Sequence, residues 1–177
     1  MDVEFRSYDP EGDLDALVDL LSTEEWNFRV VPRFAPDEAR THLARGYGEA
    51  GDITLVIEAG DELIGFVRAE KVGDEHEDPQ LDFRLRERFR GRGIGTEAAR
   101  RITAVVFERC PSTFRIEAQT RRDNIGMRTA LLKAGYVLEA VYRKAWPDAG
   151  GEMVDGMGYA ILRTDWESGS STPVVWD

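Results

Sequence analysis

Cysteine is almost absent from this sequence, because Cys110 is the only one among 177 residues. A lone cysteine excludes an internal disulfide, so we expect a cytoplasmic protein. The chain also lacks an apolar run of the roughly 18 residues needed to cross a membrane. Its opening segment, MDVEFRSYDP, is charged from the second position and has no apolar core typical of a signal peptide. We therefore predict no membrane partner.

Basic residues are outnumbered by acidic ones, 23 against 34, so the formal net charge is −11. This balance disfavours general binding to nucleic acid. The arginines are nevertheless concentrated beside a group of glycines, at Arg84, Arg86, Arg88, Arg90 and Arg92. They either form surface salt bridges with nearby glutamates or attract an anionic cofactor. His76 lies in an acidic loop without convergent ligands, so we predict no metal site.

Residues 81–96, LDFRLRERFRGRGIGT, combine a strand pattern, a glycine-rich turn and the start of a helix. Apolar and polar residues alternate up to Leu85, which is the period of a strand. Gly91, Gly93 and Gly95 follow, and glycine lets backbone N–H groups approach a ligand closely. The unpaired N–H groups and the positive dipole end of the following helix meet at this turn. The stretch therefore predicts a phosphate site.

A dinucleotide-binding fingerprint, Gly-x-Gly-x-x-Gly, is the main competing interpretation of these glycines. Thr96 stands where the third glycine of that fingerprint would fall. The preceding strand also carries charges, whereas the strands of a parallel dinucleotide-binding sheet are near-continuous apolar runs. No Gly-Lys-Ser/Thr is present, which excludes the phosphate-binding loop of nucleotide hydrolases.

Hydrophobic periodicity predicts a mixed α/β sheet with helices on both faces. The elements are expected in the order β-α-α-β-β-β-α-β-α-β-β. Three successive strands before a βαβ unit favour a mainly antiparallel sheet of about seven strands over a uniformly parallel one. We expect one domain over residues 1–177, with residues 166–177 as a C-terminal tail. The expected strands are 3–8, 53–58, 63–71, 81–85, 114–119, 136–145 and 153–162.

Two motifs resemble the GNAT N-acetyltransferases. The segment 90–95, Arg-Gly-Arg-Gly-Ile-Gly, matches the family pattern Arg/Gln-x-x-Gly-x-Gly/Ala. Asn124 followed by residues 133–139, Lys-Ala-Gly-Tyr-Val-Leu-Glu, is similar to the family's second motif. Glu97-Ala98 after the turn looks most like the RimJ/RimL branch. The resemblance implies a GNAT-like fold and direct transfer of an acetyl group from acetyl-CoA to a primary amine, on a protein N-terminus or a small molecule. A homodimer is one expected assembly.

The resemblance also implies the residues that hold coenzyme A. In the family the glycine turn wraps the pyrophosphate, and main-chain groups of the fourth strand bind the pantetheine arm. Asn124 would bind the same arm, although it is equally suited to cap the following helix. The implied cofactor residues are Phe83, Arg84, Leu85, Arg90, Gly91, Arg92, Gly93, Ile94, Gly95, Thr96 and Asn124.

The catalytic groups are less clearly marked. Asp82 and Glu117 lie on the two strands that would flank the reaction, so either could act as the general base. Their alternative role is an ion pair with Arg84 or Arg115. Many relatives carry a tyrosine as the general acid where this chain has Leu131, and some place a serine where it has Met127. This departure motivates an alternative function, a non-catalytic module that binds acyl-CoA.

Four aromatic residues are candidates for binding the substrate. They are Trp26, Phe28, Tyr142 and Trp146, and we expect Trp146 to be exposed near the tip of a hairpin loop. With the acidic balance of the chain, they would suit a cationic amine through cation–π contact and charge attraction. The alternative is that they anchor loops or fill the core.

Overall fold

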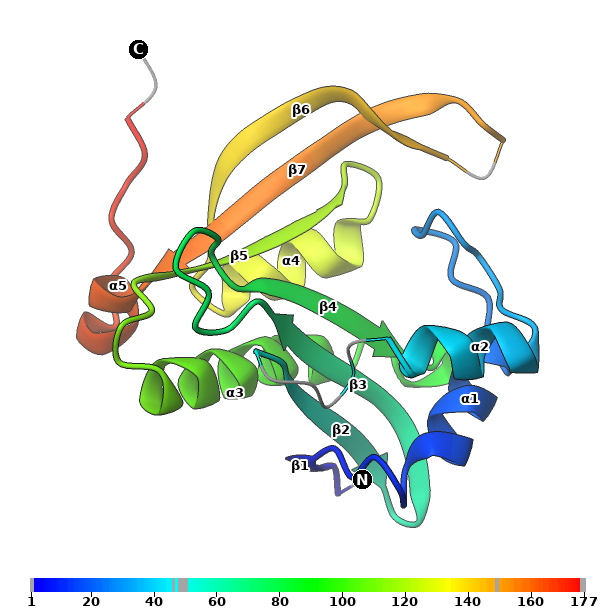
Figure 1. The fold of residues 1–177 in the computed structure, drawn as a ribbon. Helices are drawn as coiled ribbons and strands as arrows, with labels where there is room; N and C mark the ends of the chain where they lie inside the picture. Colours follow the sequence, from blue (N-terminus) through cyan, green and yellow to red (C-terminus); the bar gives the residue numbers. More distant parts are fainter. Residues whose placement is uncertain (1, 46, 48–50, 149, 176–177) are drawn as a thin grey trace.

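The computed structural model describes residues 2–45, 47, 51–148 and 150–175. This part forms a seven-stranded mixed sheet with helices on both faces (Figure 1). The strands are β1 (Glu4–Ser7), β2 (Ile53–Ala59), β3 (Glu62–Glu70), β4 (Gln80–Leu85), β5 (Arg115–Arg121), β6 (Val137–Pro147) and β7 (Met153–Leu162). The helices are α1 (Leu14–Thr23), α2 (Pro36–Leu43), η1 (Glu87–Phe89, a 3-10 turn), α3 (Ile94–Arg109), α4 (Ile125–Lys133) and α5 (Arg163–Ser168).

The predicted fold class is confirmed, with one added element. Helix α5 lies partly where the C-terminal tail was expected. Trp166 of α5 packs against Phe107 of α3, with 5.4 Å between the ring centroids. The helix is too short for its apolar period to be recognised in the sequence, and this packing against α3 supports it instead.

The strand order is β1-β2-β3-β4-β5-β7-β6, and neighbouring strands are antiparallel except β4 and β5. The parallel pair is the junction between the N-terminal and C-terminal parts of the sheet. Helix α3 makes the crossover between these two strands, as parallel pairing requires.

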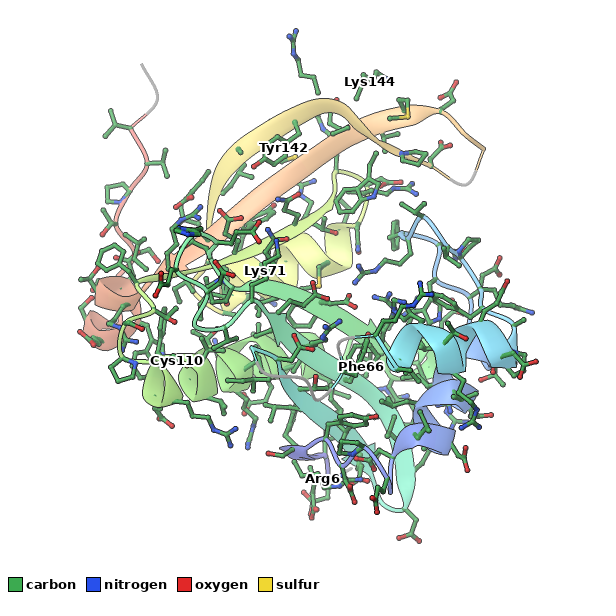
Figure 2. The ribbon with its side chains drawn as sticks, in the orientation of Figure 1. Arg6, Phe66, Lys71, Cys110, Tyr142 and Lys144 are labelled. Carbon is green, nitrogen blue, oxygen red and sulfur yellow. The ribbon has the colours of Figure 1, made fainter. Side chains whose placement is uncertain are left out.

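Each face of the sheet buries its own hydrophobic core. Successive residues of a strand point to opposite faces, so Leu55 and Ile57 of β2 join the core that includes α3, while Val56 joins the core with α1 and α2. Phe66 of β3, labelled in Figure 2, is fully buried in the second core. Burial of such a side chain contributes about 1.5–3 kcal/mol. The two cores fix the helices that surround the site described next.

Candidate functional site

A gap between β4 and β5 exposes main-chain groups of β4. In the described part of the chain the two strands pair only at Gln80–Glu117 and Leu81–Ala118, and they diverge beyond these positions (Figure 1). Arg86 N donates to Ile64 O of β3 at 2.8 Å. By the two-residue period of an antiparallel ladder, the main chain of Phe83 and Leu85 therefore faces away from β3 and into the gap.

The glycine turn leaves the backbone bare at the start of α3. Gly91 and Gly93 have φ values of 74° and 83°, in the left-handed region that glycine adopts without strain. Gly93 is the N-cap of α3 and no side chain caps this helix, so its first N–H groups are open to an external acceptor. A Cβ added to Gly91 or Gly93 would meet no atom within 4 Å. The turn is therefore suited to an anionic group such as phosphate.

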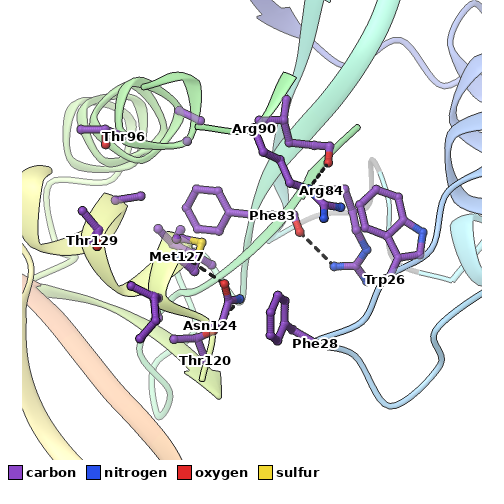
Figure 3. A pocket seen from close by; sticks show the side chains of 18 of the residues that line it. Trp26, Phe28, Phe83, Arg84, Arg90, Thr96, Thr120, Asn124, Met127 and Thr129 are labelled. Atoms are coloured by element: carbon purple, nitrogen blue, oxygen red, sulfur yellow. Dashed lines mark hydrogen bonds between the residues drawn. The ribbon is translucent and has the colours of Figure 1, made fainter. Parts of the chain in front are cut away.

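A cleft of about 400 Å³ connects the turn with the gap (Figure 3). Its two ends are distinct. The glycine end is lined by Arg90, Gly91, Gly93, Gly95 and Thr96, and the aromatic end by Trp26, Phe28, Arg29, Arg84 and Trp146. In Figure 3, Thr96 and Trp26 lie on opposite sides of Phe83. Arg90 connects the two ends, because its guanidinium carbon lies 5.7 Å from the centroid of the Trp26 ring.

Most of the residues predicted to hold the cofactor line this cleft. They are Phe83, Arg84, Leu85, Arg90, Gly91, Gly93, Gly95, Thr96 and Asn124. Ile94 and Arg92 are not among the lining residues. Ile94 is buried in the core under α3, and the guanidinium of Arg92 lies 5.8 Å from the centroid of the Phe89 ring.

Asn124 both caps α4 and lines the cleft. Its Oδ1 accepts from Met127 N at 3.2 Å, and its Nδ2 donates to Thr120 Oγ1 at 3.1 Å. An amide side chain carries a second N–H and further lone pairs. The two sequence interpretations of Asn124 are therefore compatible, because capping leaves hydrogen-bonding capacity for a ligand.

Two arginines share one carboxylate at the aromatic end. Arg29, in the loop between α1 and α2, and Arg84 of β4 both donate to Asp82 Oδ1, the latter at 2.6 Å. Burial would raise the pKa of Asp82, but the charges of Arg84 and Arg29 outweigh burial and hold that pKa below its ordinary value. Asp82 is thus a poor proton acceptor. It is also absent from the cleft lining, so its position gives no support to the expected role as a direct base.

Glu117 likewise lies outside the cleft lining. It pairs with Arg115, which also binds Asp78 at 2.7 Å and Glu139 at 2.6 Å. Gln119, two residues further along β5, does line the cleft. Glu117 is therefore placed as in the ion-pair alternative, and it does not contact the space where an amine would lie.

The positions where relatives carry a general acid supply none here. Leu131 is fully buried, and Met127 lines the cleft with a thioether that cannot donate a proton. The nearby Tyr136 is also buried, and its hydroxyl is 2.7 Å from Thr103 Oγ1. Burial raises the pKa of Tyr136 further above its ordinary value. Tyr136 is therefore a core residue with a satisfied hydroxyl.

The aromatic end is cationic, which corrects the expectation of acidic attraction. The charged residues that line the cleft are Arg29, Arg84, Arg90 and Lys133, and no acidic residue among the described ones does so. The aromatic faces are also occupied by the protein's own cations. The guanidinium of Arg84 lies 5.4 Å from the Trp26 ring centroid, and that of Arg121 lies 5.4 Å from that of Phe28. The acidic excess of the chain lies away from this cleft.

Two of the four predicted aromatic residues need correction. Trp146 is not exposed in a hairpin loop but is half-buried in β6, where it lines the cleft. The pairing of β6 with β7 shifts register between Tyr142 and Trp146, and such irregularities change the direction of side chains. Tyr142 is 44% exposed and lies over Gly158, outside the cleft lining (Figure 2).

Arg121 links segments that border the aromatic end, and no pattern in the sequence indicates this role. It belongs to β5, which extends two residues beyond its predicted end. Its Nη1 donates to Asn27 O of the α1–α2 loop at 3.1 Å and to Pro147 O of β6 at 3.4 Å. Its Nε and Nη2 pair with Asp123, and this lowers the pKa of Asp123. Among so many arginines, only the tertiary contacts distinguish Arg121.

No helix among the described residues is long and apolar enough to cross a membrane. The same residues contain no group of three or more histidine, cysteine, aspartate or glutamate side chains arranged to hold a metal ion.

Solved structures share this fold at low sequence identity. A chimera of the spermidine N-acetyltransferase SpeG from Vibrio cholerae and hSSAT superposes with a TM-score of 0.79 at 18% identity, over 94% of this chain and 99% of that chain. RimL, a ribosomal alpha-N-protein acetyltransferase in complex with coenzyme A, gives 0.78 at 20% identity, over 90% and 93%. The V. cholerae spermidine N-acetyltransferase in complex with CoA and spermine gives 0.76 at 18% identity, over 93% and 98%.

The family assignment comes from the sequence profile. No curated protein sequence matches the chain. The model of the acetyltransferase (GNAT) domain, by contrast, matches residues 2–137, which include the gap and the glycine turn. Together with the strand order around the parallel pair, this match shows that the chain belongs to the GNAT acetyltransferase family.

Proposed function

We propose that this protein is an N-acetyltransferase that transfers an acetyl group directly from acetyl-CoA to a primary amine. The observation that carries the proposal is one continuous cleft. It joins a glycine-lined helix N-terminus without a side-chain cap to a gap in which main-chain groups of β4 are not paired with β5. The first feature suits a pyrophosphate and the second suits an extended arm with amide groups.

Each part of the cleft has a distinct task in this proposal. The N–H groups at 91–96 and the side chain of Arg90 hold the pyrophosphate. Arg90 is positioned for this because its Nε donates to Leu85 O at 3.0 Å. Main-chain groups of Phe83 to Leu85 orient the pantetheine arm and polarise the thioester carbonyl, and Asn124 adds a side-chain contact. Arg92 contributes to the local positive charge.

The chain itself need do little acid–base work. Acetyl-CoA supplies an activated thioester, and transfer forms a C–N bond as the C–S bond breaks, with one proton leaving the amine and one reaching the thiolate. Neither Asp82 nor Glu117 lines the cleft, so we propose that the amine loses its proton to water. If Glu117 takes part, it does so through water, whereas Asp82 positions Arg29 and Arg84. Rate enhancement then comes chiefly from orientation of the two reactants.

Several finer points belong to the same proposal. The Glu97-Ala98 pair and the structural likeness to RimL support placement near the RimJ/RimL branch. The amine is a protein N-terminus or a small molecule. We also propose one domain over residues 1–177, a cytoplasmic location and a homodimer as the assembly to test.

A non-catalytic module that binds acyl-CoA is the competing function, and the buried Leu131 is the observation that favours it. Calorimetric titration with coenzyme A tests the shared part of both functions, since we expect saturable binding at one site. Release of free thiol from acetyl-CoA across a panel of amines then separates them. Tight binding without turnover of any amine would establish the module, and absence of binding would refute both.

A further inference from the structure

The charged side chains that line the aromatic end of the cleft are cationic. Arg29 and Arg84 both line it, and both donate to the same oxygen of Asp82. Two guanidinium groups therefore share one carboxylate. No described residue of the cleft lining is acidic, and Asp82, which lies outside the lining, supplies one negative charge to these two guanidinium groups.

Arg84 also has an unused hydrogen-bond donor. Its side chain is only 6% exposed, and its Nε is buried without a hydrogen-bond partner among the described residues. A buried donor without a partner is costly and uncommon in native structures, so it calls for a physical explanation. The unused donor belongs to one of the two arginines that share Asp82.

Both guanidinium groups are held in place before any ligand binds. Arg84 lies between Trp26 and Phe66, with ring centroids 5.4 Å and 6.0 Å from its guanidinium carbon. Arg29 donates to Phe83 O at 3.2 Å. Phe83 belongs to the segment of β4 that we propose to orient the thioester. The positive charge is thus fixed beside the position where the reacting amine would lie.

We propose that the amine substrate carries a carboxylate close to its amino group, and that Arg29 and Arg84 bind this carboxylate. The inference rests on the proposed acetyltransferase function and specifies its substrate class. Guanidinium groups match the planar geometry of a carboxylate and form charge-assisted hydrogen bonds with it. A polycationic amine is disfavoured because it would bring further positive charge against this pair.

Matched substrates test the proposal. The kcat/KM for acetylation is measured for α-amino acids and for the corresponding amino-acid amides, which lack the carboxylate charge, with spermidine as a polycationic probe. Because loss of the carboxylate also lowers the pKa of the amino group, each kcat/KM is expressed per concentration of unprotonated amine. We expect the amino acids to exceed their amides and spermidine by about 10- to 100-fold, the range for a hydrogen bond to a charged group. Peptides that begin with aspartate or glutamate, set against asparagine or glutamine counterparts, show whether the carboxylate can come from a side chain.

Variants in the α1–α2 loop test whether Arg29 causes the preference for carboxylate-bearing amines. Arg29→Gln should remove the preference by raising KM for the carboxylate substrates more than KM for the corresponding amides. Arg29→Lys should restore part of the preference, because it keeps the charge without the planar fork. Arg33→Gln is the matched control, since Arg33 is exposed in the same loop and does not line the cleft.

The outcomes separate this inference from the proposed function. Equal or faster turnover of amides or spermidine would overturn the inference alone, as would an Arg29→Gln variant that raises KM equally for charged and uncharged amines. Coenzyme A binding without turnover of any amine would overturn the proposed function and this inference together.

Discussion

The glycine end of the cleft presents main-chain groups, whereas the aromatic end presents side chains from separate segments. At the glycine end, Gly91, Gly93 and the first turn of α3 are contiguous in the chain. At the aromatic end, Arg29 comes from the α1–α2 loop, Arg84 from β4 and Trp146 from β6. The first end depends on local backbone torsions, and the second depends on tertiary packing and a shared charge. Substitutions should therefore affect the two ends in different ways.

The largest effect is expected at the glycine end. Gly93→Glu should weaken coenzyme A binding by at least about 100-fold, because it strains a left-handed position and puts negative charge where phosphate is proposed to bind. Calorimetry checks this. Gly60→Glu is the matched control, since Gly60 also has a positive φ, 62°, and open space around it. Unchanged affinity in Gly93→Glu would contradict the phosphate assignment.

The second largest effect is expected from replacing Asp82, the carboxylate that Arg29 and Arg84 share. Asp82→Asn should lower the free energy of unfolding by about 3 kcal/mol, because it leaves two enclosed guanidinium groups without their carboxylate. Asp15→Asn breaks the exposed pair with Arg40 and should cost no more than about 0.5 kcal/mol. Urea denaturation at neutral pH measures both. A loss for Asp82→Asn no greater than that for Asp15→Asn would show that the network contributes little.

The difference in stability between the wild type and the Asp82→Asn variant is expected to depend on pH. The pKa of Asp82 is lower in the folded protein than its unfolded value of about 3.9. Its stabilising contribution is therefore fully present above the unfolded pKa and is lost as the pH falls through that value toward the folded pKa. The difference in stability between the wild type and Asp82→Asn should shrink over this acidic range. A difference that persists in acid would indicate a packing effect instead.

A smaller effect is expected from the link across the aromatic end. Arg121→Met removes the hydrogen bonds to Asn27 O and Pro147 O, so it should raise KM for the amine about 10-fold. The Kd for coenzyme A should change less than about 2-fold, because the glycine end is not touched. Arg122→Met is the control, since Arg122 is 65% exposed beside it. Equal changes in both constants would mean that the two ends are not independent.

The smallest effect is expected at Glu117. Glu117→Gln should change kcat less than about 3-fold and leave the pH–rate profile parallel to that of the wild type, because Glu117 pairs with Arg115 outside the cleft lining. A rate lost at neutral pH and recovered at high pH would instead assign Glu117 as the general base.

The sequence predicted the glycine end far better than the aromatic end, and the reason is physical. Residues 81–96 carry the strand, the turn and the helix start together, so short-range rules are sufficient to describe them. The contact of Arg121 with Asn27 joins residues distant in the chain, and no local rule predicts it. Trp146 was misplaced because a register shift in β6 cannot be recognised from alternation alone. The overall fold was predictable because turn residues divide the chain into strands and helices of recognisable length, even where a strand such as β3 is buried on both faces and lacks an alternating pattern.

The brief pairing of β4 with β5 has a mechanical consequence. Because these strands pair at two register positions, few main-chain hydrogen bonds join the N-terminal and C-terminal parts of the sheet. A ligand lying in the gap would form hydrogen bonds with the main chain of β4 where β5 does not pair with it. Under the proposed function, the acyl donor bridges β4 and β5 where they do not pair, so donor binding should raise the free energy of unfolding by mass action. The affinity for the amine would then depend on whether the donor is bound between the two parts of the sheet.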